Sequence, residues 1–309
     1  MIGRLTAGAQ VCLVGDPPVP GPSSHSFITS ALALIPWVHL DSADVPGEHD
    51  QLRLMQRGQE FSIRVGSIEL MNSRLSGSEQ ALATLTCARL QDRPDARVLI
   101  GGLGMGFTLR AALDRLGPEA RVVVAELVPA VAAWARGALS HLFEGSLEDP
   151  RVELRLEDVS RAIQSGPAQY DAILLDVDNG PEGMTRRQND RLYDIWGVRR
   201  AHYALRPGGI LAVWSGRPDR RFKARLRNCG FTVDEVRVHA NGSSGRRHVV
   251  WLATRPAEKP ALMGCCASPA ATRVCCKVRS CQPACVFSAS VSRVRGLKAD
   301  RLLSADTVE

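Results

Sequence analysis

Apolar residues along this chain follow two different patterns, which meet near residue 97. Residues 52–56, 61–65 and 68–71 alternate apolar and polar positions and are separated by turn-forming residues 57–59 and 66–67. Alternation interrupted by short glycine-containing turns predicts a small antiparallel β meander. Residues 78–90 follow with helical composition, and their leucines fall on one face of a predicted helix with Ser78 as its N-cap.

From residue 97 onward, continuously apolar segments alternate with helical ones. The predicted strands are residues 98–100, 121–126, 152–156, 171–176 and 210–214. The predicted helices are residues 107–116, 129–139, 159–164, 192–204 and 220–228. Apolar strands separated by helices indicate a parallel sheet that is covered on both faces.

Two further strands, residues 231–238 and 247–254, close the pattern. A short turn-rich segment joins them, so they must run antiparallel. The predicted fold class is therefore α/β: a doubly wound, mostly parallel, Rossmann-like sheet that ends in an antiparallel hairpin, preceded by the small β meander. This strand order is typical of class I S-adenosylmethionine-dependent methyltransferases, whereas a plain dinucleotide-binding fold continues with parallel strands.

Composition divides the chain into four predicted segments. Residues 1–34 are expected to form a loose leader, residues 35–75 the meander, residues 76–255 an adenosyl-binding catalytic domain, and residues 256–309 a disordered cysteine-rich tail. Six of the nine cysteines lie in this tail, mostly as vicinal pairs and without histidine partners. That arrangement does not match a zinc site, so no metal is expected.

The net charge of +7 is concentrated in the tail, where residues 256–309 hold eight Lys/Arg and four Asp/Glu. The rest of the chain is weakly basic, so the charge does not imply a nucleic-acid partner. No apolar run approaches the roughly 18 residues of a membrane span. The N-terminus is also a poor match to a signal peptide, so we expect a cytoplasmic protein with no membrane partner.

The stretch VLIGGLGMGF holds the first candidate binding residues, Gly101, Gly102, Gly104 and Gly106. Glycines after a strand permit positive φ and let a ligand approach backbone N–H groups closely. The spacing fits G-x-G-x-G but not the dinucleotide pattern G-x-G-x-x-G, because Phe107 takes the last position. The loop therefore favours an adenosyl ligand over a dinucleotide.

Acidic residues follow the next two strands, at the edge where a doubly wound sheet binds ligands. Glu126 lies 20 residues past the loop. Its carboxylate can accept paired hydrogen bonds from the two hydroxyls of a ribose, in NAD and in an adenosyl ligand alike. Asp158 either accepts from the adenine amino group or caps the helix that begins at residue 159.

Asp176 ends the apolar strand DAILLD. Burial there would raise the pKa of its carboxyl and suit it to act as a general base toward an attacking amine. Asp178 and Asn179 either add polar groups to the site or only shape the turn that follows.

Together these residues resemble the spermidine synthase (polyamine aminopropyltransferase) family over roughly residues 52–254. The similar segments are VLIGG, VVVAELVPAV, DPRVELRLEDV, YDAILLDVDNGPEG and LYDIWGVRRAHYALRPGGILAVWSG. They correspond to the family's glycine loop, ribose-binding acid, adenine-side acid, catalytic aspartate, and following helix and strand. The meander corresponds to its N-terminal β-domain.

The resemblance implies a transferase of polyamine biosynthesis that uses decarboxylated S-adenosylmethionine or S-adenosylmethionine as co-substrate, with a small-molecule amine as acceptor. It assigns catalysis to Asp176, and the cofactor site to Gly101, Gly102, Gly104, Gly106, Glu126 and Asp158. It assigns acceptor binding to Asp178, Asn179, Glu79 and Tyr193. A homodimer is compatible with this family and is left open.

The chain departs from the family pattern on the acceptor side. Gly104 stands where the family usually has an aspartate that pairs with the ammonium of the aminopropyl donor. The family's Tyr-His-Glu signature is replaced by a segment in which Glu79 is the only acid, and its Asp-Ser-Ser-Asp-Pro loop by DVDNG. Two alternatives to aminopropyl transfer therefore remain: methyl transfer to a small molecule, favoured by Gly104, and a non-catalytic adenosyl-binding module.

Overall fold

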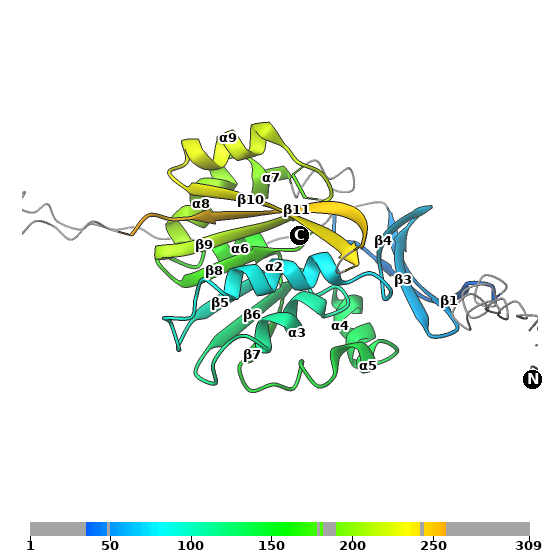
Figure 1. The fold of residues 1–309 in the computed structure, drawn as a ribbon. Helices are drawn as coiled ribbons and strands as arrows, with labels where there is room; N and C mark the ends of the chain where they lie inside the picture. Colours follow the sequence, from blue (N-terminus) through cyan, green and yellow to red (C-terminus); the bar gives the residue numbers. More distant parts are fainter. Residues whose placement is uncertain (1–34, 48–49, 178–179, 182–189, 242–243, 258–309) are drawn as a thin grey trace, which may run out of the picture. The chain divides into compact units, whose positions relative to one another are not determined.

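The computed structural model describes residues 35–47, 50–177, 180–181, 190–241 and 244–257 (Figure 1). The predicted leader, nearly all of the predicted tail, and the candidate residues Asp178 and Asn179 lie outside this range. Among the helices described, none has both the length and the apolar character needed to cross a bilayer.

The first sheet of the described chain has four strands in the order β1-β2-β3-β4, each antiparallel to the next. The strands are β1 (Val38–Asp44), β2 (Gln51–Arg57), β3 (Glu60–Val65) and β4 (Ile68–Asn72). The predicted meander is confirmed, and β1 is an additional edge strand. It escaped prediction because nearly all of its residues are exposed, so its sequence lacks an apolar alternation.

The second sheet has seven strands in the described chain, in the order β10-β11-β9-β8-β5-β6-β7. They are β5 (Arg97–Gly101), β6 (Arg121–Glu126), β7 (Val152–Leu156), β8 (Tyr170–Leu175), β9 (Leu205–Ser215), β10 (Thr232–Asn241) and β11 (Ser244–Thr254). Strands β5 to β9 are parallel, and β11 is antiparallel to both β9 and β10. The predicted doubly wound sheet with a closing hairpin is confirmed, and β11 alone is reversed.

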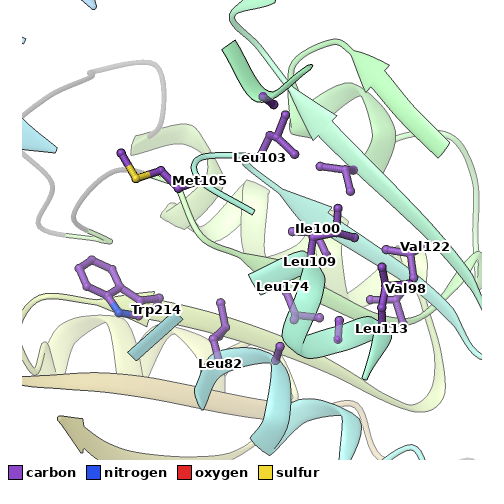
Figure 2. Packing of buried hydrophobic residues seen from close by; sticks show 14 of the residues in the cluster. Leu82, Val98, Ile100, Leu103, Met105, Leu109, Leu113, Val122, Leu174 and Trp214 are labelled. Atoms are coloured by element: carbon purple, nitrogen blue, oxygen red, sulfur yellow. The ribbon is translucent and has the colours of Figure 1, made fainter. Parts of the chain in front are cut away.

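Helices cover both faces of this sheet (Figure 1). They are α2 (Gly77–Cys87), α3 (Phe107–Leu113), α4 (Pro129–Arg136), α5 (Ser140–Phe143), α6 (Val159–Ile163), α7 (Asp190–Tyr193), α8 (Ile195–Ala204) and α9 (Arg220–Asn228). Buried residues of α2 to α5 join one core cluster, and those of α6 to α9 join the other. Figure 2 shows part of the first, where Val98 and Ile100 of β5 lie near Leu109 and Leu113 of α3.

Three sequence predictions about element ends are wrong. The cap of α2 is Ser76, and Ser78 lies inside the helix. The predicted helix 192–204 is broken at Asp194, because its carboxylate accepts a hydrogen bond from Gly197 N at 2.7 Å and starts α8 afresh. The strand predicted at 210–214 begins earlier, at Leu205, because Leu205 pairs with Tyr170 of β8 and Ile210 with Ala172, with a bulge between the two pairs.

Candidate active site

The loop after β5 is held by close backbone contacts that require glycine at Gly102. This residue has φ +91°, and a Cβ added to it would lie 2.5 Å from the carbonyl oxygen of Asp176. Gly104 has φ +51°, and a Cβ added to it would lie 3.2 Å from the Met71 sulfur. Both glycines line a cavity at the carboxyl ends of the strands.

The other two predicted glycines serve packing. A Cβ on Gly101 would lie 2.8 Å from Val159 Cγ2, and one on Gly106 would lie 2.6 Å from the Phe143 ring. Neither glycine is among the described residues that line the cavity. The loop needs all four glycines, but only Gly102 and Gly104 face the space a ligand would occupy.

Glu126 is a buried carboxylate at the end of β6 that faces this cavity. Its Oε2 accepts a hydrogen bond from Leu103 N at 2.9 Å, and its Oε1 accepts one from Val128 N at 2.8 Å. Burial raises the pKa of Glu126, and the backbone N–H groups act against this rise. The N–H groups of Leu127 and Gly104 also act on this carboxylate, which is thereby oriented as a hydrogen-bond acceptor on the cavity wall.

Asp158 caps the helix that follows it and also lines the cavity. Its Oδ1 accepts a hydrogen bond from Ser160 N at 2.8 Å and so caps α6. The same residue lines the cavity beside Glu126. The cap fixes the carboxylate at the cavity wall, with one oxygen outside this hydrogen bond.

Asp176 follows β8, and its carboxyl is also perturbed. Thr108 Oγ1 donates to its Oδ2 at 2.6 Å. Burial, followed by the negative charge of Glu79, raises the pKa of Asp176 to about 7, although the Thr108 hydrogen bond lowers it. A pKa near neutrality allows this carboxyl to accept and release a proton under ordinary conditions.

Asp176 also lies where two cavities meet. The first cavity is the one beside Glu126 and Asp158, and the second is lined by Glu79, Phe107 and Trp214 among others. Residues common to both are Leu70, Met71, Gly104 and Asp176. Strands of the four-stranded sheet supply much of the apolar wall of the first cavity, through Leu52, Ile63, Val65, Leu70 and Met71.

Two curated proteins are similar to part of this chain. The polyamine aminopropyltransferase of Mycobacterium tuberculosis is 32% identical over 151 residues, which is 46% of this chain and 28% of that protein. Polyamine aminopropyltransferase 2 of Pseudomonas aeruginosa is 35% identical over 127 residues, 40% of this chain and 34% of that protein. The chain thus spans about a third of the length of these relatives. No protein-family model matches it.

Solved structures identify the fold. Spermidine synthase from Thermotoga maritima superposes with a TM-score of 0.56 at 18% identity, over 70% of this chain and 72% of that one. A spermidine synthase in complex with the transition state analogue AdoDATO gives the same values. The chain has the spermidine synthase fold. The predicted resemblance is confirmed at this level, for the seven-stranded sheet and the antiparallel sheet that precedes it.

Of the predicted acceptor residues that the structure describes, Glu79 lines a cavity and Tyr193 does not. Glu79 lines the second cavity, and burial raises the pKa of its carboxyl. The Tyr193 hydroxyl donates to the carbonyl oxygen of Val177 at 3.2 Å, and its ring meets Phe222 edge-on in the second core cluster. Tyr193 thus supports the segment after Asp176 and is not among the described residues lining either cavity.

Sequence reasoning missed several polar groups of the site. Thr108 lies within an ordinary helical pattern, and nothing in the sequence pairs it with Asp176. His248 Nδ1 lies 2.9 Å from Ser78 Oγ, and its ring meets Trp214 edge-on at 4.8 Å. Trp214 lines the second cavity, and its buried Nε1 has no hydrogen-bond partner among the described residues. Its position at the end of the predicted strand 210–214 is the signal in the sequence that could have identified Trp214.

The described residues contain no group of three or more His, Cys, Asp or Glu side chains positioned to hold a metal ion.

Proposed function

We propose that this chain transfers an aminopropyl group from decarboxylated S-adenosylmethionine to a small amine, with Asp176 as the general base. The observation that carries the proposal is the position of Asp176. It lines both cavities, and its pKa is raised to about 7. A base at this junction can act on an amine in one cavity that attacks a donor in the other.

The first cavity is the donor site. Gly102 and Gly104 lie against the methionine-derived portion, Glu126 accepts from the ribose hydroxyls, and Asp158 accepts from the adenine amino group. The buried carboxylate of Glu126, oriented by backbone N–H groups on the cavity wall, supports this assignment, because a carboxylate can accept paired hydrogen bonds from the two hydroxyls of a ribose. Two relatives named polyamine aminopropyltransferase support the aminopropyl group as the one transferred.

The second cavity is the acceptor site. The lone pair of the amine nitrogen attacks the carbon next to the positive sulfur, a C–N bond forms, and the C–S bond breaks to leave a neutral thioether. The proton lost from nitrogen passes to Asp176. Glu79 gives the same cavity a second carboxyl, which attracts an ammonium group, while Phe107 and Trp214 give it apolar walls.

Thr108 allows Asp176 to change protonation state without losing a partner. Its Oγ1 lies 2.6 Å from Asp176 Oδ2 and 3.3 Å from the carbonyl oxygen of Glu79. When Asp176 is ionised, Thr108 donates to it. When Asp176 is protonated, it donates to Thr108, whose own hydrogen then turns to the Glu79 carbonyl.

The test is product formation. The purified chain is mixed with decarboxylated S-adenosylmethionine and putrescine, then with a panel of other amines, and products are followed by mass spectrometry. We expect an aminopropylated amine and methylthioadenosine in equal amounts. Asp176→Asn should lower kcat on the order of 10²-fold or more, because it removes a general base.

Asp219→Asn is the matched control. Asp219 caps α9, where its carboxylate accepts from Arg221 N and Phe222 N, and asparagine caps a helix equally well. It should keep the wild-type rate. Product formation that is unchanged in Asp176→Asn would refute the assignment of the base.

Methyl transfer is the second candidate, and Gly104 favours it. The structure leaves no side chain at residue 104 to pair with an aminopropyl ammonium, and its φ of +51° disfavours one. Calorimetry separates the two donors: tighter binding of S-adenosylmethionine than of its decarboxylated form would support methyl transfer. Binding of either donor with no turnover across the amine panel would support a non-catalytic adenosyl-binding module.

A further inference from the structure

Helix α2 connects the second cavity to β11 through two hydrogen bonds. Ser78 Oγ donates to Glu79 Oε2 at 2.7 Å, and His248 Nδ1 lies 2.9 Å from the same Oγ. A hydroxyl has one hydrogen, which Ser78 gives to Glu79, so the hydrogen of the second contact belongs to His248 Nδ1. The three side chains form a continuous path from a cavity carboxyl to an imidazole.

The middle of this path is buried, whereas its two ends face a cavity and the solvent. Ser78 is only 1% exposed, so water does not reach the middle of the path. Glu79 faces the second cavity, and His248 is half-buried. A proton that arrives on Glu79 thus has a route through Ser78 to a group in contact with solvent.

The surroundings of His248 keep its ring neutral. Trp214 on β9 and Val238 on β10 face it with uncharged side chains, and α2 faces it with Ser78 and, behind it, Glu79. Burial, followed by the charge of Arg246, lowers the pKa of His248. A protonated imidazole at this place gives up its extra proton readily.

We propose that Ser78 and His248 are positioning residues in a proton relay that carries the proton of the acceptor amine from Glu79 to solvent. The proposal rests on the amine-transfer function proposed above and adds the route by which its proton leaves. Asp176 and Glu79 line the same cavity, and the charge of Glu79 raises the pKa of Asp176. The relay includes a transfer of the proton from Asp176 to Glu79 within that cavity.

One cycle of the relay moves one proton from Glu79 to solvent. Protonated Glu79 donates its hydrogen to Ser78 Oγ, and Ser78 passes its own hydrogen to Nδ1 of His248 in the Nε2–H tautomer. The imidazolium that forms releases the Nε2 hydrogen to water. This leaves Glu79 ionised and His248 in the Nδ1–H form that donates to Ser78. Before the next turnover the ring has to turn away from Ser78, so that Nε2 takes up a proton from water and Nδ1 releases its hydrogen to water, which restores the Nε2–H tautomer. One proton enters at Glu79 and one leaves at His248.

The first experiment needs no substrate. Nitrogen-15 NMR of the full chain at pH 8, with His248→Gln to assign the signal, should show His248 mainly as the Nδ1–H tautomer. Ser78→Ala should shift it toward the Nε2–H form, and Glu79→Gln should lower the pKa of His248, because the charge it feels through Ser78 is lost. A tautomer and a pKa that neither variant moves would overturn the relay.

The second experiment measures turnover as a function of pH. His248→Gln keeps an N–H group that can face Ser78, but its side chain does not titrate. We therefore expect kcat to fall about tenfold, which is less than the effect of removing a base in contact with substrate. KM should stay unchanged. Added imidazole should restore the rate of His248→Ala. His202→Gln is the control, because His202 is also half-buried with a lowered pKa but packs against Phe231.

Unchanged kcat in both His248 variants, or a lowered kcat that imidazole does not restore, would overturn the relay. If the wild-type chain makes no product from any amine, the proposed function fails. The NMR result still decides separately whether Glu79, Ser78 and His248 are coupled.

Discussion

At the scale of single residues, the sequence predicted the acids of the site better than their interactions. Asp176 was expected to be buried with a raised pKa, and burial is the largest cause of the rise. The second cause, the charge of Glu79, comes from a helix 97 positions earlier in the chain. Only the packing of α2 against the sheet brings these two carboxyls into one cavity.

The raised pKa of Asp176 predicts a pH dependence of stability. Between about pH 4 and 7 the folded chain holds a proton on Asp176 that the unfolded chain, with a pKa of 3.8, has released. Wild-type stability should therefore decrease as pH rises through this window, because each pKa unit corresponds to about 1.4 kcal/mol.

Asp176→Asn has no such proton to lose. Thermal denaturation should find it more stable than wild type at pH 8, with the difference shrinking toward pH 4. Asp219→Asn should follow the wild-type curve. A curve for Asp176→Asn parallel to wild type from pH 4 to 8 would show that ionising Asp176 carries no cost.

Gly102 yields a second prediction at this scale. Gly102→Ala should destabilise the fold and abolish nucleoside binding, because its Cβ would lie 2.5 Å from the carbonyl oxygen of Asp176. Gly145→Ala is the matched control: Gly145 also has positive φ, +78°, but nothing lies within 4 Å of its Cβ position. It should cost only the backbone strain, about 1 kcal/mol. Calorimetry with an adenosyl ligand and urea denaturation measure both effects.

At the scale of elements, the periodicity predicted which segments are helices and which are strands, but several ends differ. The predicted helix 192–204 breaks at Asp194 because the Asp194 side chain accepts a hydrogen bond from Gly197 N and caps a new helix. The spacing of apolar residues contains no information about such a cap. Strand β1 was missed because an exposed edge strand needs no apolar face. Element type follows from the spacing of apolar residues, whereas element ends depend on individual hydrogen bonds.

Substitutions of Asp158 can separate its role as the N-cap of α6 from its proposed role in binding an adenosyl ligand. Asp158→Asn should keep the cap and therefore the melting temperature, yet weaken adenosyl binding, because the carboxylate at the cavity wall is replaced by a neutral amide. Asp158→Ala should lose both, with about 1 kcal/mol of stability. Equal ligand affinity in wild type and Asp158→Asn would leave Asp158 as a helix cap alone.

At the scale of the whole molecule, one edge of the parallel strands leads to the cavities and the opposite edge holds an ion-pair cluster around a buried carboxylate. The carboxyl ends of β5, β6, β7 and β8 lead into residues of the first cavity, while Asp171 near the start of β8 forms ion pairs at the opposite end. Its buried carboxylate pairs with Arg93 and Arg206 and accepts from Arg97 N at 2.8 Å. These contacts join the segment before β5 to the first residues of β9.

These ion pairs predict a loss of stability that is separate from function. Asp171→Ala should cost about 3 kcal/mol in urea denaturation, because it leaves two arginines without their shared buried partner. Asp234→Ala, which removes an exposed partner of Arg89, should cost no more than about 1 kcal/mol. Adenosyl affinity should stay unchanged in the folded fraction of both. A similar loss in the two variants would show that burial of Asp171 adds nothing.

The sequence by itself determined the order and type of most elements, the glycine loop, and the acids at three strand ends. These features follow from local spacing, since a parallel sheet places the end of each strand at one edge. Only the tertiary structure decided that Gly101 and Gly106 serve packing, that the meander walls the first cavity, and that Glu79 and His248 are joined through Ser78. The reason is that these contacts join residues far apart in the chain, and their geometry depends on how helices and sheets pack, which the spacing of residues along one element does not contain.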